Sequence, residues 1–200
     1  MAVLVGQPAP DFTAAAALGN GEIVNAYTLS EEIKGSKAVI FFYPLDFTFV
    51  CPSELIAFDN RIEEFEKRGV KVIGVSIDSH WTHNAWRNTP VSEGGIGPVK
   101  YPLIADINHE ICKAYDVESA GGVAFRGSFL IDEEGVVRHQ VVNDLPLGRN
   151  VDEMLRMVDA LAFHQEHGEV CPAGWKDGDA GMTATPDGVA SYLSDNSESL

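Results

Sequence analysis

A cysteine stands where an apolar strand pattern gives way to a helical pattern, and this junction is the place where the sequence most directly suggests chemistry. Residues 37–43 form an apolar run typical of a buried strand, and Cys51 and Pro52 open the helical pattern that follows. A helix N-terminus offers unpaired N–H groups and a partial positive charge, both of which stabilise an anion. Proline suits the first helical turn because its missing N–H would have no partner there. This position therefore suits a cysteine that reacts as a thiolate.

Two nearby residues fit a small, partly dry pocket around this sulfur. Thr48, three residues before Cys51, can direct its hydroxyl at the sulfur, and Pro44 can exclude water without competing for hydrogen bonds. An unreactive buried cysteine fits the same local pattern, because cysteine is one of the most commonly buried residue types. The residues alone leave both interpretations open.

The composition excludes several function classes. The chain has 200 residues, 45% hydrophobic and 22% charged, which are ordinary values for a globular domain. No apolar run reaches the length of a membrane span, and the first residues lack the features of a secretory signal, so we expect a cytoplasmic protein. The net charge of −16, from 14 basic and 30 acidic residues, argues against nucleic acid or an anionic membrane as the main partner.

The cysteine count argues against a structural disulfide framework. Cys51, Cys112 and Cys171 are the only cysteines, and no CxxC pair occurs, so a paired zinc half-site and a thioredoxin-type dithiol are both absent. We interpret Cys112 as a packed residue. The spacing of His164, His167 and Cys171 is compatible with metal ligands on a helix end, but we expect no metal and no cofactor.

The order of elements is typical of a thioredoxin-like α/β domain. The sequence predicts a small N-terminal hairpin with its turn near Asn20, then alternating strands and helices. The expected elements are a strand over 37–43, a helix over 52–68, a strand over 70–76, helices over 80–88 and 108–116, strands over 125–132 and 136–142, and a helix from Asn150 that stops at Gly168.

The C-terminal part differs in composition from the rest. From Lys176 onward the chain is acidic and rich in glycine and serine, so we expect most of it to be mobile. Val189, Tyr192 and Leu193 have the spacing of a short amphipathic helix. We therefore expect a thioredoxin-like domain over residues 1–167, followed by a C-terminal extension over residues 168–200.

A family resemblance decides between the interpretations of Cys51. The stretch PLDFTFVCP, residues 44–52, resembles the active-site signature of the peroxiredoxins, specifically the typical two-cysteine group. Residues 125–132, 142–149 and 167–175 resemble further segments of that family in the same order. The similarity runs over residues 6–192, and it implies a thioredoxin fold with the N-terminal hairpin and C-terminal extension of that group.

The resemblance implies a role for each matching residue. It implies a thiol peroxidase that acts on hydrogen peroxide and organic hydroperoxides, with no cofactor. The implied roles are peroxidatic cysteine for Cys51, hydrogen bonding of the peroxide for Thr48, stabilisation of negative charge for Arg126, shielding of the sulfenic acid for Pro44, and orientation of Arg126 for Glu54 and Arg149. Without the resemblance, Glu54 and Arg149 would be interpreted as a solvent-exposed pair.

Cys171 resembles the resolving cysteine, which in this family comes from the partner subunit. The resemblance thus implies a Cys51–Cys171 disulfide between chains, although the residues alone leave a bridge within the chain open. It also implies recycling by thioredoxin or a flavoprotein disulfide reductase, and homodimers that assemble into decamers, with Phe47 and Trp86 as candidate ring contacts.

Two other functions compete with a peroxidase. A ring-forming holdase chaperone or peroxide sensor is the alternative that the resemblance also allows. A thioredoxin-type disulfide exchanger is disfavoured because it would require a second cysteine at the position of Glu54.

Two segments bear on over-oxidation. In sensitive members of the family, a Gly-Gly-Leu-Gly loop and a Tyr-Phe pair slow the unwinding of the active-site helix. The corresponding residues here are Gly94, Gly95, Ile96 and Gly97 in the loop and Tyr192 and Leu193 in the tail. Because leucine has less contact area than phenylalanine, we expect intermediate sensitivity to over-oxidation.

Overall fold

The computed structural model describes residues 2–200. The chain divides into two compact units, Met1–Val151 and Asp152–Leu200, and each unit is described by itself. The domain division expected at residues 167 and 168 stays a prediction. Among the described residues, no helix combines the length and apolar character needed to cross a membrane.

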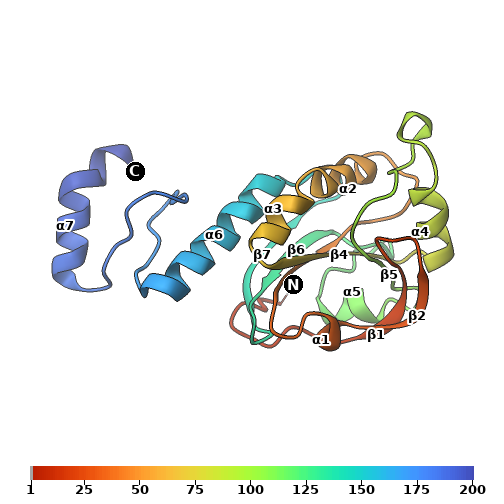
Figure 1. Ribbon diagram of the computed structural model, residues 1–200, viewed down its shortest axis with the longest axis horizontal. Helices are drawn as coiled ribbons and strands as arrows, with labels where there is room; N and C mark the ends of the chain where they lie inside the picture. Colours follow the sequence, from red (N-terminus) through yellow and green to blue (C-terminus); the bar gives the residue numbers. More distant parts are fainter. Residues whose placement is uncertain (1) are drawn as a thin grey trace. The chain divides into compact units, whose positions relative to one another are not determined.

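The first unit is built on a mixed sheet, which has seven strands within the described residues, in the order β2-β1-β5-β4-β3-β6-β7 (Figure 1). The central pairs β3–β4 and β4–β5 are parallel, and the remaining pairs are antiparallel. The strands are β1 (Thr13–Ala17), β2 (Ile23–Thr28), β3 (Lys37–Phe42), β4 (Val70–Ser76), β5 (Leu103–Ala105), β6 (Arg126–Ile131) and β7 (Val137–Asn143).

The helices of this unit pack on both faces of the sheet. They are α1 (Leu29–Glu32), α2 (Cys51–Asp59), α3 (Ile62–Lys67), α4 (His80–Arg87) and α5 (Glu110–Ala114), with a 3-10 turn η1 at Val91–Glu93. Successive side chains of a strand point to opposite faces. On one face Phe41 of β3 stacks on Phe58 of α2, with ring centroids 4.1 Å apart.

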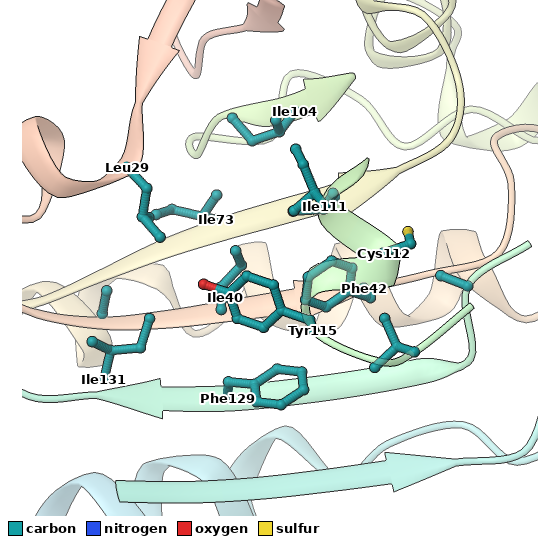
Figure 2. Close-up of a cluster of buried hydrophobic side chains, with 14 of the residues drawn as sticks. Leu29, Ile40, Phe42, Ile73, Ile104, Ile111, Cys112, Tyr115, Phe129 and Ile131 are labelled. Carbon is teal, nitrogen blue, oxygen red and sulfur yellow. The ribbon is translucent and has the colours of Figure 1, made fainter. Parts of the chain in front are cut away.

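The other face of the sheet carries the larger apolar cluster. Ile40 and Phe42 of β3 lie there with Phe129 of β6, and Cys112 of α5 and Tyr115, the residue after α5, cover them (Figure 2). The centroid of the Phe129 ring lies 5.1 Å from that of Tyr115 and 5.8 Å from that of Phe42, in edge-on contacts that aromatic rings favour. These contacts fix β3 and β6 side by side, and both strands lead to the candidate site.

The predicted order of elements is confirmed, with one error and two omissions. The N-terminal hairpin, the strands of the centre and the later helices lie where they were expected. The single helix expected over 52–68 is wrong: α2 ends at Asp59, Asn60 is a weak helix former, and Arg61 leaves helical geometry with φ −113° and ψ 7°. The strand β5 and the helix α1 were not predicted, because elements of three and four residues are too short to show a period.

The second unit holds the resolving-cysteine candidate. The helix α6 (Val151–His167) belongs to this unit except for its first residue, Val151. Gly168 follows it with a left-handed φ of 69°, as expected for a residue that ends a helix. An antiparallel bridge then joins Val170 to Met182. The helix α7 (Pro186–Asn196) contains the predicted Val189, Tyr192 and Leu193, and the turn η2 (Ser197–Ser199) follows it.

Phe129 tests how much the α5 side of the core contributes to stability. A Phe129→Ala substitution removes a fully buried ring that contacts both Phe42 and Tyr115, and should lower the free energy of unfolding by about 3–5 kcal/mol. Denaturant titration of the reduced protein measures this. The control Phe49→Ala removes the same group from a side chain that is 96% exposed, and should change stability by under about 0.5 kcal/mol. Equal losses for both variants would contradict this description of the core.

Candidate active site

Three elements bring the candidate site together. Cys51 is the first residue of α2, and residues 43–50 connect it to the end of β3. Arg126 is the first residue of β6, which pairs antiparallel with β3. Glu54 lies in the first turn of α2. The side chains of all three residues are almost completely buried, and Cys51 is 1% exposed.

Two polar groups approach the sulfur of Cys51. The Thr48 hydroxyl oxygen lies 3.1 Å from Sγ, and Nη1 of Arg126 lies 3.5 Å from it. The Thr48 hydroxyl is also 2.8 Å from the Leu45 carbonyl oxygen, which can accept its single proton. The sulfur is therefore almost completely buried, but a hydroxyl and a guanidinium face it, so it is not surrounded by hydrocarbon alone.

Glu54 holds two guanidinium groups. Its Oε2 accepts from Arg126 Nη1 at 2.6 Å, and its Oε1 accepts from Arg149 Nε at 2.9 Å and from the Arg149 backbone N–H at 3.0 Å. Arg149 Nη1 also donates to the carbonyl oxygens of Phe42 and Gly127. The exposed fractions of the three side chains are 2–4%. The alternative of a solvent-exposed Glu54–Arg149 pair is thus wrong.

The charges of this cluster balance only if the sulfur is ionised. Two guanidiniums and one carboxylate leave one positive charge, and a thiolate at Cys51 would bring the total to zero. Burial by itself would lower the pKa of Arg126, but the neighbouring Cys51 sulfur and the Glu54 carboxylate outweigh it and raise that pKa. Arg126 therefore remains a cation. Its Nε–H donates to the Leu145 carbonyl oxygen at 2.7 Å, and this bond helps to orient the guanidinium.

Pro44 is buried in the loop after β3 and precedes Leu45, whose carbonyl oxygen accepts from the Thr48 hydroxyl. Asp46 was not predicted as a site residue, although it lies between Pro44 and Thr48 in the signature. The contact between Asp46 Oδ2 and Nδ1 of His83 in α4, at 2.7 Å, was not predicted either. An acidic residue inside an otherwise apolar loop was the signal that could have identified this pair.

Cys171 lies in the second unit, beside α6. Its sulfur is 3.4 Å from the Ala160 carbonyl oxygen, and the side chain is partly exposed. Burial raises the pKa of the Cys171 thiol, while the positive charge of Arg156 opposes this shift. Arg156 was not predicted: it donates to the Trp175 carbonyl oxygen at 2.8 Å and pairs with Glu153 one turn earlier.

The predicted over-oxidation residues lie in both units. In the first unit Gly94 and Gly97 have left-handed φ values of 85° and 69°, and the Gly94 carbonyl oxygen accepts from the Trp86 indole at 2.9 Å. A Cβ at Gly95 would lie 1.9 Å from the Thr89 carbonyl oxygen. Ile96 is buried. In the second unit, the predicted tail pair lies on α7, with Tyr192 partly buried and Leu193 exposed.

The other residues that the sequence singled out lie in the core or make ordinary structural contacts. Cys112 is fully buried in the core, as expected, and burial raises the pKa of its thiol. His164 Nδ1 lies 2.8 Å from the Glu169 carbonyl oxygen. Within residues 2–200, no group of three or more His, Cys, Asp or Glu side chains is arranged to hold a metal ion. Of the two candidate ring contacts, Trp86 is fully buried and Phe47 is half exposed.

The fold and this site together define a class of protein. A buried cysteine at a helix start, on a thioredoxin-like sheet, with a hydroxyl and a clamped guanidinium at its sulfur, is equipped to attack an electrophile and to stabilise the negative charge that leaves. This arrangement is that of a thiol-dependent peroxidase.

Comparison with known proteins identifies the family. The AhpC/TSA family matches residues 5–140, and the C-terminal domain of 1-Cys peroxiredoxin matches residues 160–195, a segment that here contains Cys171. Alkyl hydroperoxide reductase C of Helicobacter pylori is 58% identical over 198 residues, which cover 99% of this chain and 100% of that protein. Peroxiredoxin-2 of Macaca fascicularis is 51% identical over 95% of each chain.

A solved structure agrees with these relatives. The reduced 2-Cys peroxiredoxin of Plasmodium vivax has a TM-score of 0.93 and 44% identity, and the match covers 96% of this chain and 100% of that one. The chain belongs to the AhpC/TSA family and is a peroxiredoxin of the typical two-cysteine, AhpC type.

Glu54 tests whether the buried charges depend on one another. Glu54→Gln keeps the shape of the side chain but leaves two buried guanidiniums without a carboxylate, and should lower the free energy of unfolding by about 3–5 kcal/mol. Chemical denaturation of the reduced protein is the measurement. The control Glu64→Gln removes an exposed carboxylate that also faces two cations, Lys67 and Arg68, and should leave the midpoint unchanged. An unchanged midpoint for Glu54→Gln would contradict the description of a coupled cluster.

Proposed function

We propose that this peroxiredoxin reduces hydrogen peroxide and organic hydroperoxides through Cys51, with Thr48, Arg126 and Pro44 as its active-site partners. The observation that carries the proposal is the position of the Cys51 sulfur, 3.1 Å from the Thr48 hydroxyl and 3.5 Å from the Arg126 guanidinium. Sulfur supplies the redox chemistry, so the reaction needs no metal, haem or flavin in this chain.

In the first step the Cys51 thiolate attacks the terminal oxygen of the peroxide. A bond forms between sulfur and that oxygen, the O–O bond breaks, and the departing alkoxide or hydroxide takes a proton to leave as alcohol or water. Arg126 stabilises the charge that develops on the departing oxygen, and Glu54 and Arg149 keep its guanidinium in place. If the Thr48 proton goes to Leu45, its lone pair can accept from the peroxide. Pro44 shields the site from water.

In the second step Cys171 resolves the Cys51 sulfenic acid. The Cys171 thiolate attacks the sulfenic sulfur, a disulfide forms and water leaves. We infer that the bridge joins two subunits. Because Cys51 sits at a closed helix start, the first turn of α2 must unwind for the two sulfurs to meet, since a disulfide needs its Cα atoms within about 7 Å.

The partners follow from this cycle. We infer that a dithiol donor, thioredoxin or a flavoprotein disulfide reductase, reduces the disulfide, and that the chain acts in the cytoplasm as a homodimer that assembles into decamers. Phe47, which is half exposed, fits a contact between subunits better than the fully buried Trp86. We also propose that the chain consists of a peroxidase domain over residues 1–167 and a resolving segment over residues 168–200.

Sensitivity to over-oxidation depends on how fast Cys171 arrives. We propose intermediate sensitivity, because Gly94, Gly95, Ile96 and Gly97 form a glycine-rich loop tied to α4 through Trp86, while Leu193 replaces an aromatic residue of the tail. Tyr192 keeps the aromatic half of that pair.

The cysteines give the most direct test of the cycle. After one equivalent of peroxide, the wild type and Cys112→Ser should form a covalent dimer on non-reducing electrophoresis, because Cys112 is buried in the core. Cys51→Ser and Cys171→Ser should each abolish it. A dimer that persists without Cys51 would refute the proposal. A holdase role would instead survive in Cys51→Ser as protection of a client protein from aggregation, without peroxidase activity.

The pH dependence of the second step follows from the Cys171 pKa. Burial favours the neutral thiol and raises that pKa above its ordinary value of 9.0, whereas the attacking species is the thiolate. Between pH 6 and 8 the thiolate fraction, and with it the rate of disulfide formation, should rise by about tenfold per pH unit. Rapid quenching of peroxide-treated protein with an alkylating agent measures this rate. A rate that falls with pH would contradict attack by a Cys171 thiolate, whereas a flat rate would show that unwinding of α2 limits the step and not the attack.

A further inference from the structure

A fully buried polar cluster lies beneath the loop that carries Thr48, and no step of the proposed reaction uses it. The side chains of Asp46 and His83 are 0% exposed, and His83 Nδ1 lies 2.7 Å from Asp46 Oδ2. The Tyr43 hydroxyl donates to Asp46 Oδ1 at 2.8 Å. Three ionisable side chains from β3's end, the loop and α4 thus share one dry site.

The hydrogen bonds of His83 show that this cluster holds a shared proton. Its Nε2 lies 3.1 Å from the carbonyl oxygen of Ile104 in β5, which can only accept, so Nε2 must carry a hydrogen. A proton must then lie between Nδ1 and Asp46 Oδ2 as well, because an ionised carboxylate and a bare ring nitrogen are both acceptors. The pair is either imidazolium with carboxylate or imidazole with carboxylic acid, and in both forms it carries no net charge.

The cluster is connected to the active-site loop through Asp46. The backbone N–H of Asp46 donates to Asp78 Oδ2 at 2.8 Å, and the Ser76 hydroxyl donates to the same oxygen at 2.7 Å. Asp46 is therefore held both through its backbone and through its carboxyl group. These anchors come from β4 and the loop after it, and from α4, so the loop is fixed to the sheet.

The residues on both sides of Asp46 need this anchor. Phe47 has a left-handed φ of 53°, which is unfavourable for a residue with a bulky side chain. Leu45 presents the carbonyl oxygen that orients the Thr48 hydroxyl. If Asp46 were released, Phe47 could relax to a negative φ, and the Leu45 carbonyl oxygen and Thr48 would move away from the Cys51 sulfur.

We propose that the Asp46–His83 pair is a positioning device for the peroxide-binding loop, which holds Thr48 at hydrogen-bonding distance from the Cys51 sulfur. Asp46 and His83 are positioning residues, because neither touches the sulfur. The inference rests on the proposed peroxidase function, since it assigns the pair to the first step of that reaction. Burying such polar groups is costly, and an apolar set of the same volume would often be at least as stable. Their value here is the single conformation that they impose on residues 44–48.

Two variants at Asp46 test the shared proton and the contacts of the carboxyl group. In Asp46→Asn the amide oxygen can accept from Tyr43 and the amide NH2 can donate to Nδ1 of neutral His83, so every contact of the carboxyl group is retained. Asp46→Leu has similar volume and retains none of them. We expect Asp46→Asn to stay within about threefold of wild type and Asp46→Leu to be slower by about 100-fold in oxidation of Cys51 by hydrogen peroxide.

A second pair of variants removes one hydroxyl each. Tyr43→Phe takes the donor from Asp46 Oδ1, and should slow Cys51 oxidation by about tenfold. Tyr115→Phe is the matched control: this tyrosine is also fully buried, but its hydroxyl donates to the Pro10 carbonyl oxygen. Tyr115→Phe should leave the rate within about twofold of wild type. If Asp46→Leu does not fold, the comparison of Tyr43→Phe with Tyr115→Phe tests the positioning role in its place.

The readout separates positioning from general destabilisation. Stopped-flow oxidation of Cys51 by hydrogen peroxide is compared with alkylation of Cys51 by iodoacetamide, which requires the sulfur but not the alignment of a peroxide. A positioning role lowers the peroxide rate and keeps the alkylation rate within about threefold of wild type. A merely loosened structure would speed alkylation, and that result would overturn the proposal.

Three further outcomes each test one part of the proposal. Wild-type peroxide rates in folded Asp46→Leu, or in Tyr43→Phe, would overturn the positioning role and leave the proposed function intact. An Asp46→Asn variant as slow as Asp46→Leu would overturn the shared-proton assignment. A wild-type protein whose Cys51 is not oxidised by hydrogen peroxide would instead refute the proposed function itself.

Discussion

The carboxylate of Glu54 is the interaction on which the site depends. It lies in the first turn of α2, three residues after Cys51, and binds the guanidiniums of Arg126 and Arg149 with almost no access to water. Arg126 comes from β6, and Arg149 precedes α6, so one side chain ties the start of the reactive helix to two other parts of the fold. Ions removed from water are stable only when they are paired and fully hydrogen-bonded. The position of the reactive helix, the direction of the Arg126 guanidinium and the closure of the pocket therefore depend on one another.

The sheet provides the rigidity that this arrangement needs. Strands β3 and β6 pair directly, and their side chains pack between α5 on one face and α2 on the other. Arg126 begins β6, whereas Cys51 begins α2 and is joined to β3 by residues 43–50, so the sheet fixes the position of Arg126 and the packing of α2 on the sheet helps to fix that of Cys51. The loop between β3 and α2 needs separate support, and the buried groups around Asp46 supply it.

Much of this could be predicted from the sequence, and what could not has a physical reason. The apolar runs of β3 and β4 and the signature around Cys51 are local patterns, so strands, helix start and candidate cysteine were all found. The strand β5 was missed because it is defined by its neighbours β1 and β4 and not by its own three residues. The Asp46–His83 contact was missed because it joins positions 37 residues apart, and His83 has no local feature that marks it as a partner.

The charge balance of the buried cluster has a consequence for the catalytic cycle. With a thiolate at Cys51, the four groups sum to zero, whereas a sulfenic acid is neutral and leaves one unbalanced positive charge in a dry pocket. In the proposed cycle, oxidation of Cys51 would thus weaken the electrostatic interaction that keeps the pocket closed. Because an unpaired buried cation is unstable, access of water to the arginines would then favour unwinding of the first turn of α2. The ionised cysteine of the reduced state thus helps to keep its own pocket closed, and its oxidation favours opening.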